Sequence, residues 1–72
     1  MSTLLKLLDT TALTENMPEH NLYRRQVGTI VEILASKTYE VEFNDNEGQT
    51  YAMLALLANQ LIVLHYHFLQ AA

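Results

Sequence analysis

The segment Gln26–Phe43, QVGTIVEILASKTYEVEF, decides the fold that this sequence predicts. Its first part, Val27–Leu34, is rich in β-branched residues that recur at every second position. Its second part, Tyr39–Phe43, alternates three apolar residues with two glutamates. A period of two with β-branched and aromatic residues is typical of strands, and the short polar link at 35–37 favours an antiparallel hairpin.

Three further strands are predicted. One, Leu7–Leu13, precedes the hairpin, and two, Thr50–Leu56 and Leu61–Phe68, follow it. The segment 15–23 is polar and contains Pro18, so we expect a loop there. Ala58–Gln60 interrupts the apolar pattern before the last strand and suits one 3₁₀ turn. The Met, Leu and Ala content of Tyr51–Gln60 also suits a helix, which is the alternative for that segment. Five short strands with these connections predict an all-β fold, a small and strongly bent barrel.

Size and composition predict a single small domain over residues 1–72, with a leader (1–6) and a tail (69–72) that can be flexible. Half of the residues are hydrophobic. A domain this small buries only about 60% of its unfolded surface, so some apolar side chains must stay exposed. Self-association or a protein partner is the common way to cover such a surface.

The formal charge is −4, from eight acidic and four basic residues. Nucleic-acid binding needs cations that neutralise phosphates, and an anionic membrane repels an acidic chain. We therefore expect neither nucleic-acid nor membrane partners. The first residues have no basic flank and Lys6 interrupts their apolar run, so they do not predict a signal peptide. The chain has no cysteine, which fits a reducing compartment, and we expect it in the cytoplasm.

The combined pattern resembles a small bacterial family known as domain of unknown function 4926. The similarity runs from about Leu7 to Tyr66 and rests on LLDT from residue 7, Leu13, PEHNL from residue 18, VGTIVEIL from residue 27, YEVEF from residue 39, Asp45, Gly48, TYA from residue 50, Leu56 and Gln60-Leu61. The resemblance implies a five-stranded SH3-like barrel of the kind also found in KOW modules, and it implies no activity.

The chain departs from this family at two positions, where glycines are frequent and where Asn21 and Arg25 stand here. Asparagine tolerates the left-handed backbone, whereas arginine would be strained in it, so we expect a different loop before the second strand. KOW modules are typically basic, whereas this chain is acidic. A KOW-like nucleic-acid reader is therefore an alternative that the charge disfavours.

The last predicted strand, Leu61–Phe68, is apolar on both faces, which a small barrel can cover on one side only. We expect it to bind a protein partner or a second copy of the chain. The residues predicted to take part in this surface are Leu61, Val63, His65, Tyr66, His67 and Phe68. In the alternative, leucines 4–8 of the same chain fold over the strand.

His65 and His67 lie two positions apart, so on a strand they point the same way and could share a zinc or nickel ion. His20 is a conceivable third ligand. A closed zinc site needs four ligands, so we predict no cofactor and keep the small metal-binding protein as an alternative function.

Three other residues are candidates for a role beyond folding. Glu40 and Glu42 share a face and could serve acid–base chemistry, but the clean alternation around them predicts ordinary solvated carboxylates. Gly28 marks either a bend in its strand or a close approach by a partner. No nucleophile has a histidine at a recognisable spacing, so we expect no enzyme.

The prediction is a non-enzymatic interaction module, in the manner of antitoxin or immunity proteins.

Overall fold

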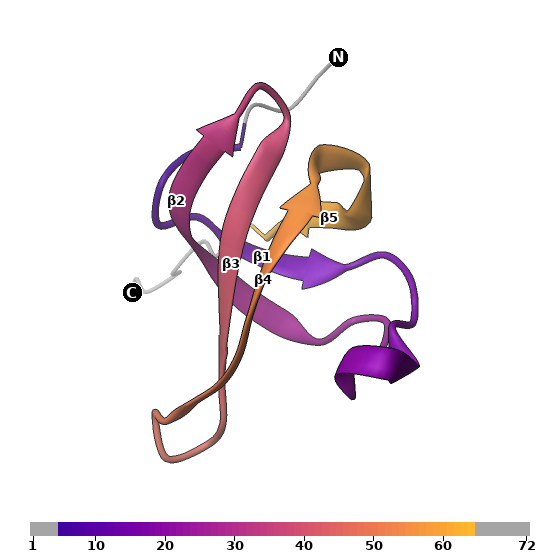
Figure 1. Ribbon diagram of the computed structural model, residues 1–72. Coiled ribbons are helices and arrows are strands. Elements are labelled where there is room, and N and C mark those ends of the chain that lie inside the picture. Colours follow the sequence, from indigo (N-terminus) through magenta and orange to yellow (C-terminus); the bar gives the residue numbers. More distant parts are fainter. Residues whose placement is uncertain (1–4, 65–72) are drawn as a thin grey trace, which may run out of the picture.

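The computed structural model describes residues 5–64 of the chain. Five strands and two short 3₁₀ helices follow one another: β1 (Thr10–Leu13), η1 (Pro18–His20), β2 (Val27–Ala35), β3 (Thr38–Asn44), β4 (Thr50–Leu57), η2 (Ala58–Gln60) and β5 (Leu61–Val63). The strands form one antiparallel sheet in the order β4-β3-β2-β1-β5 (Figure 1). The predicted all-β fold, a small five-stranded SH3-like barrel with a 3₁₀ turn before the last strand, is confirmed.

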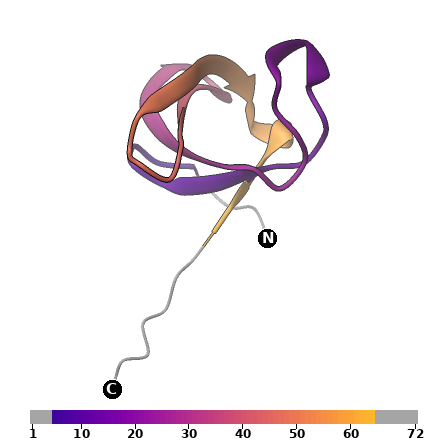
Figure 2. The ribbon, with the colours of Figure 1, turned by 90° about the horizontal axis from the view of Figure 1, so that it is seen from below.

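The central hairpin forms where the sequence predicts it, with a link of only two residues between β2 and β3. The register shifts twice within it, between Ile30 and Glu32 and again between Ile33 and Ala35. Each shift leaves one extra residue on β2, and such bulges bend a strand and increase its twist. Figure 2 shows the result, a sheet that curls around a central space.

The core fills the inside of this curl. In the part of the chain that the structure describes, nine hydrophobic residues are buried: Leu13, Met17, Leu22, Ile30, Tyr39, Val41, Phe43, Leu56 and Leu61. They come from all five strands and from the loop around η1, so the loop closes one side of the barrel. Thr11 is the buried polar residue, and its hydroxyl donates to the carbonyl oxygen of Gly28, 3.2 Å away. This bond satisfies the hydroxyl inside the core.

The first strand is shorter than the predicted Leu7–Leu13, because a turn occupies its start. The Asp9 amide donates to the Lys6 carbonyl oxygen at 3.0 Å, and Leu8 has a φ of 69°. The Asp9 carboxylate also accepts from the Lys6 amide. A left-handed residue in a four-residue turn cannot continue a strand, so β1 begins at Thr10.

β2, β3 and β4 agree more closely with the predicted bounds, whereas β5 begins as predicted and ends earlier. β4 extends one residue past the predicted Leu56, so the helix considered for Tyr51–Gln60 is wrong for most of that segment. β5 ends at Val63, and Leu64 follows it outside any strand. The remaining residues of the predicted last strand, 65–68, lie outside the part that the structure describes. Within residues 5–64, no helix has the length and hydropathy that crossing a membrane requires.

Candidate functional site

The predicted partner surface lies only partly within the described residues. In that part, some side chains are buried in the core and others face solvent. Leu61 is 7% exposed and belongs to the core, so it supports β5 from inside. Its neighbour Ile62 is 54% exposed and points outward, although the sequence analysis did not select it. Val63 is half-buried. The other four predicted residues, His65, Tyr66, His67 and Phe68, lie outside the described residues.

β5 occupies one end of the sheet order and pairs with β1. Leu61 lies opposite Leu13, Ile62 opposite Ala12 and Val63 opposite Thr11. The ladder runs one bond further, because the Leu64 amide donates to the Thr10 carbonyl oxygen at 2.8 Å. Within residues 5–64, no strand pairs with the other edge of β5. An unpaired strand edge can hydrogen-bond to another chain.

The leucines at positions 5, 7 and 8 differ in their surroundings: the first packs against the core and the other two are exposed. Leu5 is half-buried and packs against the core. Leu7 and Leu8 are exposed, and the Leu8 amide donates to the Ile30 carbonyl oxygen of β2. These two leucines therefore add to the exposed apolar surface.

Exposed apolar side chains are as numerous as buried ones. Among the described residues, ten large hydrophobic residues are 45–70% exposed, against nine in the core. The ten are Leu7, Leu8, Tyr23, Val27, Ile33, Leu34, Tyr51, Met53, Leu57 and Ile62. The barrel thus leaves about half of its large apolar side chains in contact with solvent, as its composition predicts.

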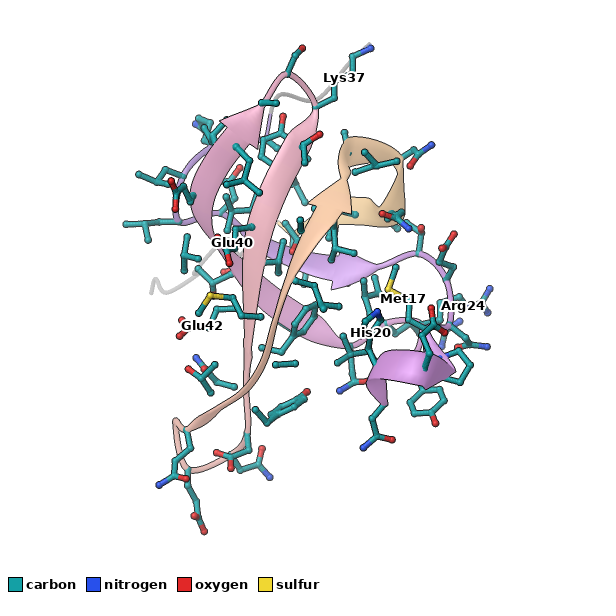
Figure 3. The ribbon with its side chains drawn as sticks, viewed as in Figure 1. Met17, His20, Arg24, Lys37, Glu40 and Glu42 are labelled. Carbon is teal, nitrogen blue, oxygen red and sulfur yellow. The ribbon has the colours of Figure 1, made fainter. Side chains whose placement is uncertain are left out.

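The outward face of the hairpin carries the two glutamates that the alternation of β3 predicts. Glu40 and Glu42 are half-buried, whereas Tyr39, Val41 and Phe43 between and beside them are buried. In register, Glu40 lies between Glu32 of β2 and Ala55 of β4, and Glu42 lies between Thr29 and Met53. Figure 3 shows both glutamates projecting away from the core. Both carboxylates thus lie on the outward face of the sheet, as the alternation predicts.

Sequence reasoning missed the outward side of β4, which lies beside these glutamates. Met53, Ala55 and Leu57 are exposed there, opposite Glu42, Glu40 and Thr38 of β3. A signal was present, because Thr50–Leu57 contains eight residues without charge, glycine or proline. Because a small barrel covers only its inner face, one face of this apolar strand must be exposed.

Gly28 turns inward, which differs from both roles considered for it. A Cβ atom at this position would lie 2.6 Å from Val41 Cγ1 and 2.8 Å from Phe43 Cε2. The bulges of β2 lie beyond it, at Ile30 to Ala35, and the Thr11–Gly28 pairing is regular. Glycine is required here because the core leaves no room for a side chain.

The loop before β2 has a left-handed backbone at the two positions where the resemblance led us to expect glycines. Asn21 has a φ of 60° and Arg25 a φ of 79°. The Gln26 amide donates to the Tyr23 carbonyl oxygen at 3.0 Å, which places Arg25 third in a four-residue turn, where a type II turn needs positive φ. The chain thus accepts an arginine in a conformation that glycine adopts without strain.

His20, the conceivable third metal ligand, is exposed in η1, whereas its two proposed partners lie outside the described residues. Figure 3 shows His20 beside Met17 and near Arg24, in the loop that precedes β2. Within residues 5–64, no three side chains of His, Asp or Glu gather where they could hold a metal ion.

Comparison with known proteins gives a family and nothing finer. No curated protein and no solved structure matches the chain at a significant level. A family model matches from residue 7 to residue 63, which covers β1 to β5 and most of the sequence. The chain therefore belongs to the family described as "Domain of unknown function (DUF4926)".

Proposed function

We propose that this protein is a non-enzymatic interaction module of the cytoplasm, which needs no cofactor and binds a protein through its last strand. The binding surface would combine the outward side of β5, represented by Ile62, with the predicted continuation of that strand, whose residues Tyr66 and Phe68 share the alternation of Ile62. The partner is a second copy of the chain or a separate protein.

The observation that carries this proposal is that, within residues 5–64, exposed large hydrophobic residues outnumber buried ones, ten against nine. Single exposed apolar residues are ordinary. With this many exposed apolar side chains in a chain of 72 residues, burying them by association is favourable. Covering a side chain such as Ile62 contributes about 1.5–3 kcal/mol when it is fully removed from water. Two or three such residues suffice for a stable contact if the geometry is good.

The charge of the chain favours a basic partner surface. The formal charge is −4, and five of the eight acidic residues lie at 32, 40, 42, 45 and 47, in and just after the central hairpin. Complementary charges at the rim of an interface mainly speed association and exclude wrong partners. An antitoxin- or immunity-like role, in which the module masks a basic protein surface, fits this charge.

The test compares the wild-type full chain with Ile62→Asp combined with Phe68→Asp. The matched control is Leu34→Asp combined with Leu7→Asp, which adds the same charge at two exposed leucines away from β5. Molar mass by light scattering reports self-association, and tagged protein retains a separate partner. We expect the β5 variant to lose the higher mass or the retained partner, while the control keeps it. Equal behaviour of wild type and both variants, all monomeric and without a retained protein, would contradict the proposal.

A further inference from the structure

β4 forms the end of the sheet opposite to β5 in the strand order, and it is the longer of the two edge strands. It pairs with β3 along its whole length, from Thr50 opposite Asn44 to Leu57 opposite Thr38. Within residues 5–64, its other edge pairs with no strand. Natural proteins protect such edges with charged residues, proline, bulges or short strands. β4 has eight residues without charge or proline, and its register shift lies at its first residues only.

The side chains of this edge are open to solvent. Met53 and Leu57 are about half exposed, and the small Ala55 lies between them on the same outward face. Ala55 has a much shorter side chain than Met53 and Leu57, and its register neighbour on β3 is Glu40.

Behind the edge lies negative charge that the sheet itself does not neutralise. Glu40 lies opposite Glu32 of β2, and like charges directly opposite one another in a sheet are destabilising. Glu42 follows on the same face, where it accepts a hydrogen bond from the Thr50 hydroxyl. The strands β2, β3 and β4 contain no lysine or arginine. The open edge therefore has apolar side chains on β4 itself and, on the adjacent strand β3, carboxylates that no lysine or arginine of these strands neutralises.

We propose that β4 accepts an extended, cationic segment of a partner protein as an added strand of the sheet. A new strand would lie about 4.8 Å from β4 and so about 10 Å from β3. A lysine or arginine opposite Ala55 bridges this distance, because its long stem lies over the alanine while its charged group reaches Glu40. The stems of flanking cationic residues pack against Met53 and Leu57, as long basic side chains do on apolar surface. Backbone hydrogen bonds supply the affinity and the alternate side chains the selectivity, as in other strand additions.

Charge identifies the occupant as a partner and not as a second copy of this edge. A second β4 would bring only uncharged residues, so the carboxylates of both copies would remain without cations. A basic strand supplies the missing charge at the register position of the alanine. This inference goes beyond the proposed function, since it concerns the other edge of the sheet, although both draw on the glutamates of the hairpin.

The experiment uses the full chain and a labelled eight-residue peptide of alternating valine and lysine. Fluorescence anisotropy gives the affinity, and hydrogen exchange locates the contact. The control peptide alternates valine with glutamate. The first variant, Glu40→Gln with Glu42→Gln, keeps the side-chain size and removes the charge. Its matched control is Glu15→Gln with Glu19→Gln, two exposed glutamates outside the hairpin. The second variant, Ala55→Lys, supplies the cation within the chain, and Ile62→Lys adds the same charge at β5.

We expect the lysine peptide to bind and to slow amide exchange in Thr50–Leu57 but not in Leu61–Val63, while the glutamate peptide does not bind. Glu40→Gln with Glu42→Gln should weaken binding about tenfold, the order expected for two partly exposed charge pairs. Ala55→Lys should abolish binding, whereas Ile62→Lys and the control glutamines should leave it unchanged. Three results would each overturn the proposal: no binding, equal binding by the hairpin glutamine variant, or protection of β4 in a dimer without peptide.

Discussion

The two faces of the β2–β3–β4 sheet obey the same alternation and differ in what holds them. On the inner face, Val41 and Phe43 are completely buried, and a neighbouring strand has a glycine because no side chain fits. On the outer face, Glu40 and Glu42 lie beside exposed apolar residues of β4. The inner face is specified by shape, and a change there alters stability. The outer face is specified by charge and exposure, so a change there alters what the sheet can bind.

The largest effect is expected from Phe43→Ala. Phe43 is the largest of the fully buried side chains, and its truncation leaves a cavity in the middle of the barrel. Such truncations cost about 3–5 kcal/mol, whereas a chain of 72 residues has a total stability of about 4–11 kcal/mol. We expect a largely unfolded or strongly destabilised protein, measured by urea denaturation. A loss below 1 kcal/mol would break the distinction between the faces.

Gly28→Ala tests the same face by addition instead of removal. The new methyl group would meet Val41 and Phe43 at less than 3 Å, so the core must shift. We expect a loss of about 1–3 kcal/mol of unfolding free energy.

The double variant Gly28→Ala with Val41→Ala sharpens this prediction. Removal of the Val41 methyl groups takes away the nearest contact, so the two losses should be less than additive by at least about 0.5 kcal/mol. Strict additivity would show that the glycine is needed for another reason.

Arg25→Gly tests the turn that leads into β2 and so fixes which of its residues face inward. Arg25 has a φ of 79°, where a residue with a side chain is strained by about 1–2 kcal/mol and glycine is not. Glycine gives back part of this gain through the entropy of the unfolded chain. We expect a net stabilisation of about 0.5–1 kcal/mol in thermal or urea unfolding. Arg24→Gly, one residue earlier, is the control and should not stabilise.

The smallest effect is expected on the outer face, from Glu40→Gln. Glutamine keeps the shape and removes the repulsion between Glu40 and the opposite Glu32. A gain of about 0.2–0.5 kcal/mol should appear at low salt and shrink as salt is added, because salt screens exposed charges. A loss of stability would mean that the carboxylate has a structural role that the register does not reveal.

The sequence predicted the central hairpin, the 3₁₀ turn and the family, because each depends on a local pattern. Alternation from Tyr39 to Phe43 stated in advance which side chains would be buried. The start of β1 was not predicted correctly, because leucine has no preference for the left-handed backbone conformation that Leu8 adopts. The inward role of Gly28 was missed for a similar reason. It depends on Val41 and Phe43, whose approach is a property of the folded sheet and not of any segment.

The outward side of β4 could have been found from the sequence with one more physical step. A barrel has an inside and an outside, so a strand that is apolar on both faces must expose one of them. The choice of face needs the register, which places Ala55 beside Glu40 and Leu56 beside Tyr39. This pairing is needed to see that the uncharged strand β4 forms an edge of the sheet next to the carboxylates of β3.

The pairing of β1 with β5 joins the beginning of the barrel to its end, with Leu13 opposite Leu61. During synthesis on the ribosome, the hairpin of β2 and β3 can form as soon as it emerges, since its contacts are local. The seam between the first and last strands can form only after β5 has left the exit tunnel. Until then β1 lacks one of its two partner strands, and the apolar surface left exposed favours aggregation.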